Sequence, residues 1–194
     1  MRIETRAMET PVGKIALAWA GDVLLAVEMA WAKNRTSWNS KDRAGDVETR
    51  LAARLRERFP DAEVTKGAKD AAPVRALERY FAGDVRAIDT LKVDAGGDGF
   101  HARVWHELRR IPAGETRSYG QIAAAAGSDS ARAAGGAVGS NPIPIVIPCH
   151  RVVGADGRLT GFGGGLPRKR WLLQHEGATF RDEDAAKAAQ ATLF

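Results

Sequence analysis

The chain contains only one cysteine, Cys149, in 194 residues. A single cysteine excludes an intramolecular disulfide, and it excludes a zinc site made of several cysteines. The segment before His101 has no histidine, no cysteine and no glycine-rich phosphate loop. We therefore predict a free thiol, no bound metal, no cofactor and a structural role for the N-terminal part.

The chain also lacks an apolar run long enough to span a bilayer, and we expect no secretory signal, because no apolar h-region is recognised in it. Hydrophobic residues make up 44% of the sequence and charged residues 27%, which is typical of a globular protein with a buried core. We expect a soluble, cytoplasmic protein, because a free thiol persists in that compartment.

Positive charge is concentrated in the second half of the chain. Residues 1–98 carry 17 lysines and arginines against 16 aspartates and glutamates, whereas residues 99–181 carry 11 against 5. All four histidines lie in the second segment. A basic segment that also holds the candidate nucleophile favours a polyanionic partner, with nucleic acid first. The alternative is a solvated positive face without a partner.

Residues 1–95 have the pattern of a small domain that combines a sheet with helices. Strand-like runs predict a β-meander within residues 1–31, and a polar loop follows. Apolar residues at helical spacing predict two helices, the first of which ends at Pro60. Three glycines within residues 95–99 cannot hold a regular element, so we place a domain boundary there. The predicted elements are strands over 14–20 and 23–29, a loop over 33–47 and helices over 47–59 and 73–81.

Residues 99–178 are predicted to form a mostly helical domain. Ser118 is the expected N-cap of one helix, and Ser128 or Asp129 that of the next. These two short helices, joined by a turn at Gly127, predict a helix-turn-helix. The predicted elements are helices over 100–111, 119–126, 130–138 and 167–176, a hairpin turn over 154–157 and a tail over 179–194.

The stretch around Cys149 carries the strongest chemical signal. The apolar run 143–148 contains two prolines and predicts a short buried strand with a rigid end at the cysteine. His150 and Arg151 follow at once. Nearby positive charge lowers the pKa of a thiol, so a reactive thiolate is predicted near neutral pH. The alternative is that Cys149 is a small buried hydrophobic residue.

The helix predicted over 130–138 has little side-chain bulk. Its residues 131–137 are Ala, Arg, Ala, Ala, Gly, Gly and Ala. A glycine inside a helix costs about 1 kcal/mol relative to alanine, so two in a row require another reason. A bare surface lets the backbone approach a flat or grooved partner, and Arg132 is the one long charged side chain on it. The alternative for Arg132 is an ordinary surface arginine.

Several separate motifs, in this order and spacing, together resemble the O6-alkylguanine-DNA alkyltransferase family (methylated-DNA–protein-cysteine methyltransferases). The match covers about residues 99–178, and the N-terminal part is similar only in its layout. The resemblance implies an α+β fold, in which a small, antiparallel, ribonuclease-like sheet domain precedes the helical domain. The zinc ligands near the N-terminus of some members are absent. The motifs are Arg117-Ser118-Tyr119-Gly120-Gln121-Ile122-Ala123, Ala131-Arg132-Ala133, Asn141-Pro142, Ile147-Pro148-Cys149-His150-Arg151-Val152, the Gly161–Gly165 loop and His175-Glu176-Gly177.

The resemblance implies DNA repair by direct reversal. An alkyl group moves irreversibly, once per protein molecule, from O6 of guanine (to a lesser extent O4 of thymine) to Cys149. A thiolate is the best side-chain nucleophile for a saturated carbon, and His150 is able to take the thiol proton if a carboxylate orients its ring. The resemblance selects Glu176 for that role, which spacing alone does not. Without the resemblance, the alternative interpretation of Glu176 is a solvated surface charge, and that of His150 is a structural histidine.

The resemblance also implies that a monomer binds duplex DNA, and it leaves cooperative binding open. Because the damaged nucleotide must leave the stack, we expect Arg132 to fill its place from a helix in the minor groove.

Tyr119 is expected to assist rotation of the phosphate and to contact the base; the alternative role for Tyr119 is packing in the core. Asn141 is expected to tie that helix to the cysteine strand; its alternative is a plain turn residue. Phe162 stands where the family often has tyrosine, so a hydroxyl contact is lost. The remaining predicted residues are Ala131, Gly135 and Arg151 for DNA binding, and Gly163 and Gly164 for the base pocket, unless these two belong to a flexible turn.

Two other functions remain open. A Cys-His hydrolase would turn over, and it would need an oxyanion hole that the sequence does not locate. A non-catalytic binder of alkylated DNA would carry another residue in place of Cys149. The size of the preferred alkyl group does not follow from the sequence.

The segment Gln190–Phe194 raises a separate hypothesis. It resembles the short peptide with which many bacterial repair and replication proteins bind the DNA sliding clamp, although Ala191 stands where leucine is preferred. Short patterns also match by accident, and the alternative is that Leu193 and Phe194 pack onto the protein itself.

Overall fold

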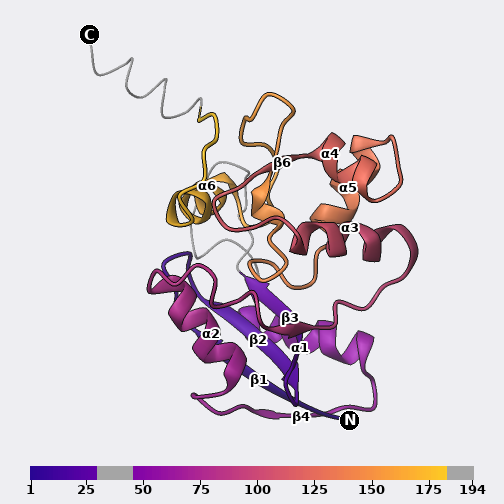
Figure 1. Cartoon of the computed structure of the whole chain (residues 1–194). Helices are drawn as coiled ribbons and strands as arrows, with labels where there is room; N and C mark the ends of the chain where they lie inside the picture. Colours follow the sequence, from indigo (N-terminus) through magenta and orange to yellow (C-terminus); the bar gives the residue numbers. More distant parts are fainter. Residues whose placement is uncertain (30–45, 183–194) are drawn as a thin grey trace.

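The computed structural model describes residues 1–29 and 46–182. Most of the loop predicted over 33–47 and the whole segment 190–194 of the clamp hypothesis lie outside these residues, so both stay predictions. Within the described ranges, no helix has the length and apolar character needed to cross a membrane. In Figure 1 the N-terminal sheet lies below and the helices that follow residue 99 lie above.

The N-terminal part is built on a five-stranded sheet in the order β4-β1-β2-β3-β5. The first three strands form the predicted antiparallel meander. The edge strands β4 and β5 pair in parallel with β1 and β3, so the expectation of an antiparallel sheet is wrong at both edges. Each edge strand follows a helix, and such a connection allows parallel pairing. The strands are β1 (Arg2–Met8), β2 (Ile15–Ala20), β3 (Val23–Met29), β4 (Glu63–Lys66) and β5 (Lys92–Val93).

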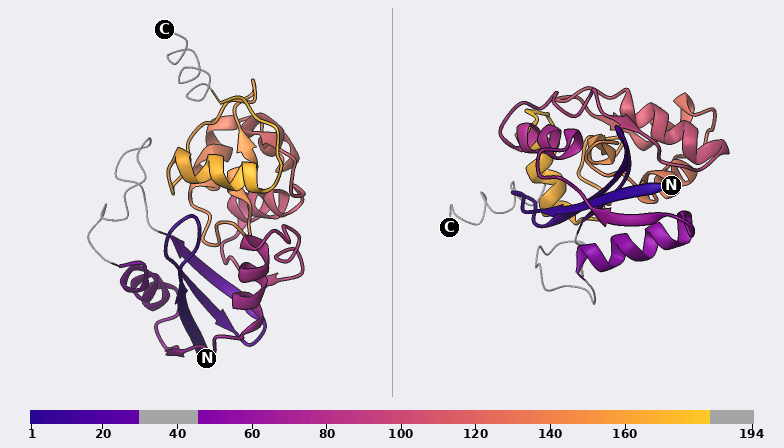
Figure 2. Two further views of the ribbon diagram at one scale, coloured as in Figure 1. Left: turned by 90° about the vertical axis from the view of Figure 1, so that its left-hand side faces the viewer. Right: turned by 90° about the horizontal axis from the view of Figure 1, so that it is seen from below.

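Both faces of the sheet are covered, each by one of the predicted helices. Successive side chains of a strand point to opposite faces. The small residues Ala16 and Ala18 of β2 pack under α1 (Val47–Arg58). Trp19 faces the other way, toward α2 (Ala72–Phe81) and the C-terminal part. Figure 2 (right) shows the two helices on opposite sides of the sheet.

The C-terminal part is mainly helical. Ser118 caps α4 as predicted, because its hydroxyl accepts from the backbone N–H of Gln121 and the Gln121 side chain accepts from the Ser118 N–H. The predicted caps of α5 are wrong: Ser130 caps it, and the Ser128 hydroxyl accepts from Ser130 N–H instead. The elements are α3 (Gly99–Arg109), β6 (Arg117–Ser118), α4 (Tyr119–Ala125), α5 (Ala131–Gly139), the 3-10 turn η1 (Cys149–Arg151), β7 (Val152–Val153) and α6 (Leu166–His175).

The apolar run before Cys149 does not form the predicted strand. It folds into a tight buried turn, closed by a 2.8 Å hydrogen bond from Ile147 N–H to the Ile143 carbonyl. Ile145 has a positive φ of 75° in this turn. Pro144 and Pro148 have no N–H to donate to a neighbouring strand, which disfavours sheet pairing. The turn places Cys149 at the first position of η1.

The two parts of the chain share one continuous hydrophobic core. Leu77 and Tyr80 of α2 belong to the same buried cluster as Leu108 of α3 and Leu172 of α6. Residues 94–98 join the parts without a helix or strand. The domain limits at 95 and 99 therefore stay a prediction, while the packing shows that the N-terminal part reaches the site described next.

Candidate active site

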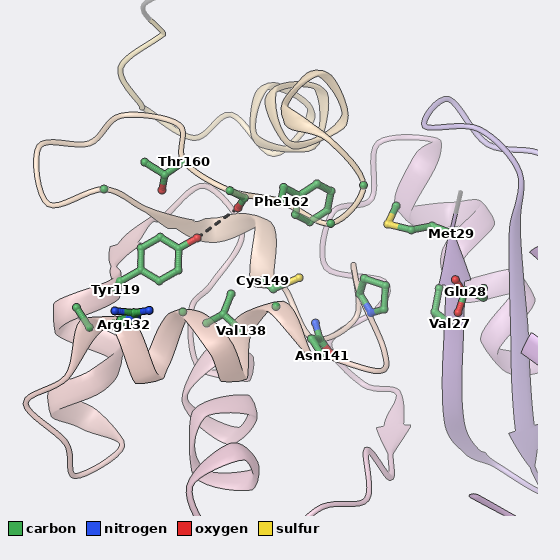
Figure 3. Close-up of a pocket in the computed structure, with 18 of the residues that line it drawn as sticks. Val27, Glu28, Met29, Tyr119, Arg132, Val138, Asn141, Cys149, Thr160 and Phe162 are labelled. Atoms are coloured by element: carbon green, nitrogen blue, oxygen red, sulfur yellow. Dashed lines mark hydrogen bonds between the residues drawn. The ribbon is translucent and has the colours of Figure 1, made fainter. Parts of the chain in front are cut away.

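A cavity of about 640 Å³ lies between the two parts of the molecule. Tyr119 and Arg132 lie at one end, Val27–Met29 of β3 lie at the other, and Cys149 lies between them (Figure 3). The cavity thus joins an exposed helix surface to a buried thiol. The predicted residues that line it are Tyr119, Ala131, Arg132, Gly135, Asn141, Cys149, Phe162, Gly163 and Gly164.

Cys149 is 7% exposed and free. Burial raises the pKa of its thiol, and the hydrogen bond from Asn141 and the charge of Lys169 oppose this only in part. The predicted lowering of the thiol pKa by the cations next in sequence is therefore wrong. The Arg151 guanidinium points to Glu176, and His150 is not charged at neutral pH. The resting thiol is protonated and needs a base to become a nucleophile.

His150 and Glu176 meet in the interior, although 26 positions separate them in sequence. Nε2 of His150 lies 2.9 Å from Oε1 of Glu176. An ionised carboxylate only accepts hydrogen bonds, so Nε2 carries the proton and Nδ1 keeps a lone pair. Nδ1 is the one buried side-chain polar atom without a hydrogen-bond partner in the described part of the chain. Burial, together with the charges of Arg151 and Lys169, lowers the pKa of His150 although Glu176 acts to raise it, which keeps the ring neutral and able to accept a proton.

Glu176 is ionised despite its burial. Burial acts to raise the pKa of Glu176, but the interactions with His150 and Arg151 outweigh it and hold that pKa well below its usual range. Nε and Nη2 of Arg151 each donate to the carboxylate at 2.8 Å, and Nη1 donates to the Ile111 carbonyl. Arg151 is 2% exposed, so its predicted role in DNA binding is wrong: the guanidinium is occupied inside the protein.

Lys169 of α6 is a second buried cation near the thiol, and no motif in the sequence singles it out. Its ammonium group donates to the carbonyls of Val152 and Thr160, on the two segments that flank the cavity. Burial lowers the pKa of Lys169 to about 8. The two hydrogen bonds of Lys169 hold the loop after Cys149 in place. Its ammonium group also places positive charge near the sulfur.

Asn141 links the end of α5 to the cysteine turn, as we expected. Its Nδ2 donates to the Ile147 carbonyl at 2.7 Å, and its Oδ1 accepts from the Ile143 N–H at 3.0 Å. Both contacts are buried. The helix that carries Arg132 and the turn that carries Cys149 are thereby held in one geometry.

The α5 surface beside the cavity is bare. Ala131, Arg132 and Gly136 are exposed. Gly135 faces the Tyr119 ring, which a Cβ at that position would meet at 3.8 Å. The Tyr119 hydroxyl donates to the Gly161 carbonyl at 3.3 Å, the dashed line in Figure 3. The Tyr119 ring therefore packs against α5 and the Gly161 loop, which agrees with the alternative of packing given above, while its contact with a phosphate and a base stays a prediction.

The loop with Phe162 closes the cavity opposite α5. A Cβ on Gly164 would lie 2.8 Å from the Phe162 ring and 3.1 Å from Sδ of Met29. Only glycine allows this approach. The loop is held from α6 by Arg168, which donates to the carbonyls of Gly164 and Val12. The described residues contain no group of three His, Cys, Asp or Glu side chains that could hold a metal ion.

The comparisons with known proteins agree with this arrangement. The family profile described as "6-O-methylguanine DNA methyltransferase, DNA binding domain" matches residues 99–178. The methylated-DNA–protein-cysteine methyltransferase of Mycobacterium tuberculosis is 41% identical over 178 residues, which cover 90% of this chain and 92% of that protein. The chain belongs to the methylated-DNA–protein-cysteine methyltransferase family.

Further members extend the comparison. The Salmonella typhimurium protein of the same name is 55% identical over 102 residues, and the match spans 52% of this chain but only 60% of that protein. The crystal structure of Mycobacterium tuberculosis OGT in complex with DNA has 37% identity and a TM-score of 0.67, covering 91% of this chain and 93% of that one. The mixed α+β fold of this chain is therefore the fold of solved family members.

The sequence missed the part of the site that comes from the first half of the chain. Val27, Glu28, Met29 and Arg54 line the cavity, and Tyr80 contacts Glu176. None of these residues stands in a chemical motif. The available signal was the strongly apolar strand over 23–29, which required a partner on each face.

Proposed function

We propose that this protein repairs DNA by moving an alkyl group from O6 of guanine to Sγ of Cys149. The observation that carries the proposal is the buried series of Cys149, His150 and Glu176 at a cavity that reaches the exposed surface of α5. Family membership supports the same reaction, and the DNA complex of the Mycobacterium tuberculosis protein supports DNA as the partner.

The reaction begins with removal of the thiol proton. Nδ1 of His150 takes it, directly or through one water, and the charge of Glu176 stabilises the imidazolium that results. The sulfur then attacks the alkyl carbon, so that the S–C bond forms as the C–O6 bond breaks. The electron pair of the broken bond stays on the guanine, which takes up one proton from the solvent and remains in the strand as an unmodified base. The thiolate of an alkylated Cys149 is a poor leaving group, so the thioether persists and one protein molecule repairs one lesion.

The DNA-facing residues explain how a base in a duplex reaches the thiol. The target nucleotide has to leave the stack, which costs a few kcal/mol. The helix pair α4–α5 acts as the helix-turn-helix, and the bare face of α5 enters the minor groove. Arg132 fills the space of the extruded base, and Tyr119 contacts that base and its phosphate. The partner is duplex DNA that carries O6-alkylguanine, bound by a monomer.

The test is intact-mass measurement after incubation with a duplex that contains one O6-methylguanine. We expect a gain of one methyl group per protein, located on Cys149 by peptide mapping, with no second turnover. Cys149→Ser should gain no mass and should still bind the duplex in a mobility-shift assay. Multiple turnovers would favour a hydrolase, and binding of the lesion without any gain of mass by the unmodified protein would favour a lesion binder.

A further inference from the structure

Tyr80 contributes a hydrogen bond to the proposed catalytic carboxylate from the other half of the chain. It lies in the last turn of α2 and is fully buried. Its hydroxyl donates to Oε1 of Glu176 at 2.7 Å, across 96 positions of sequence. The N-terminal part thus reaches the atom that orients His150.

Tyr80 is held both through its backbone and through its ring. Nε2 of His175, the residue before Glu176, donates to the Tyr80 backbone carbonyl at 2.7 Å. The imidazole of His175 also packs against the Tyr80 ring edge to face, with ring centroids 5.1 Å apart. Backbone and side chain of Tyr80 are therefore both held against the C-terminal end of α6, with the hydroxyl directed at Glu176.

Oε1 of Glu176 accepts hydrogen bonds from three groups: Nε2 of His150, Nη2 of Arg151 and the Tyr80 hydroxyl. Burial and the charge of Glu176 raise the pKa of Tyr80 well above its ordinary value, so this hydroxyl stays protonated and always donates. Each donor disperses part of the carboxylate charge. The extent to which Glu176 raises the pKa of His150 therefore depends on the hydrogen bond from Tyr80.

We propose that Tyr80 is a positioning residue for alkyl transfer: its hydroxyl occupies Oε1 of Glu176 and so limits the negative charge that this carboxylate presents to Nε2 of His150. The inference rests on the function proposed above. It gives the N-terminal part a role in the chemistry of Cys149 beyond the structural one that the sequence predicts.

Tyr80→Phe removes the hydroxyl and leaves every charged group around the pair in place. Those groups are Arg151 of η1, Lys169 of α6 and the two partners themselves, with His175 of α6 behind the Tyr80 ring. With one donor fewer, Glu176 carries more negative charge toward His150. The imidazolium is then more stable, so the pKa of His150 rises.

The pH profile of single-turnover methyl transfer tests this. In Tyr80→Phe the acid limb should move to higher pH by about 0.5–1 pH unit, the change expected for loss of one hydrogen bond to an ionised group. The rate should consequently fall several-fold on the acid limb itself and change little at pH 8.5. Duplex binding, measured by fluorescence anisotropy, should stay the same.

Phe81→Leu is the matched control. Phe81 packs against the rings of Tyr80, Trp171 and His175 but offers no polar group. Its loss should lower the melting temperature without moving the acid limb. An unmoved limb in Tyr80→Phe, or an equal movement in both variants, overturns the proposal.

An NMR titration of the His150 ring in the DNA-free protein separates this inference from the proposed function. We expect a higher His150 pKa in Tyr80→Phe than in the unmodified protein. If the unmodified protein transfers no methyl group, the proposed function fails, while the titration still decides whether Tyr80 tunes His150. Equal His150 pKa values in the two proteins overturn the role of Tyr80.

Discussion

Nε2 of His150 lies 2.9 Å from Oε1 of Glu176, and both side chains are completely buried. Because the carboxylate can only accept, the proton sits on Nε2 and the lone pair of Nδ1 is left for the thiol proton. The thiol of Cys149 cannot ionise unaided, since burial raises its pKa. The relationship between these two residues therefore determines how the transfer rate should respond to pH.

The first prediction concerns that response. The transfer rate should be constant above neutral pH and should fall as pH drops through the pKa of His150, which lies below its ordinary value of 6.5. The rate falls toward acid pH because a protonated His150 ring has no lone pair to accept the thiol proton. Glu176→Gln should lower the rate about 10²-fold, on duplex and free base alike, because an amide does not stabilise the imidazolium. A rate that keeps rising through the alkaline range would instead indicate direct ionisation of the thiol.

The second prediction separates DNA handling from chemistry. Arg132 is exposed on α5 and lies with Tyr119 at one end of the cavity, away from Cys149 (Figure 3). Arg132→Ala should therefore reduce transfer from duplex O6-methylguanine by about 10-fold or more, because extrusion of the base costs a few kcal/mol. Transfer from free O6-benzylguanine should be nearly unchanged. Equal losses on the two substrates would contradict the proposed role of Arg132.

The third prediction concerns stability. Asn141→Ala removes two buried hydrogen bonds and leaves the Ile143 N–H without its Asn141 acceptor, while the Ile147 carbonyl keeps only the hydrogen bond from the Cys149 N–H. A loss of about 2–4 kcal/mol in the free energy of unfolding is expected, measured by urea denaturation. Ser140→Ala is the control, because Ser140 makes one part-buried hydrogen bond, to the Ala137 carbonyl, and should cost less than about 1 kcal/mol. Similar losses in both variants would show that Asn141 is an ordinary turn residue.

The fourth prediction concerns the size of the alkyl group. In Gly164→Ala the new Cβ would clash with the Phe162 ring at 2.8 Å, and Met29 leaves little room behind it. The ring should move into the cavity. Competition kinetics should then show a larger loss with O6-benzylguanine than with O6-methylguanine, about 10-fold against a few-fold. An unchanged ratio of the two rates would show that Phe162 does not border the space for the alkyl group.

The sequence by itself determined the features that depend on near neighbours. The spacing of Val47, Leu51 and Leu55 predicted α1, and the Ser118-to-Gln121 pattern predicted the start of α4. These predictions hold because a helix and its cap are made by residues three or four positions apart. The order of the motifs around Cys149 also identified the family, since each motif is a short, continuous string.

Only the tertiary structure decided what surrounds the thiol. Tyr80 and Glu176 are 96 positions apart, and no local pattern connects them. Arg151 lies two residues from Cys149 in sequence, yet its guanidinium turns inward to Glu176. The pKa of the thiol is therefore dominated by burial, because His150 is neutral and the charge of Arg151 is directed to Glu176. Desolvation and long-range hydrogen bonds depend on how distant segments of the chain pack together. The residues next to Cys149 in sequence do not determine that packing.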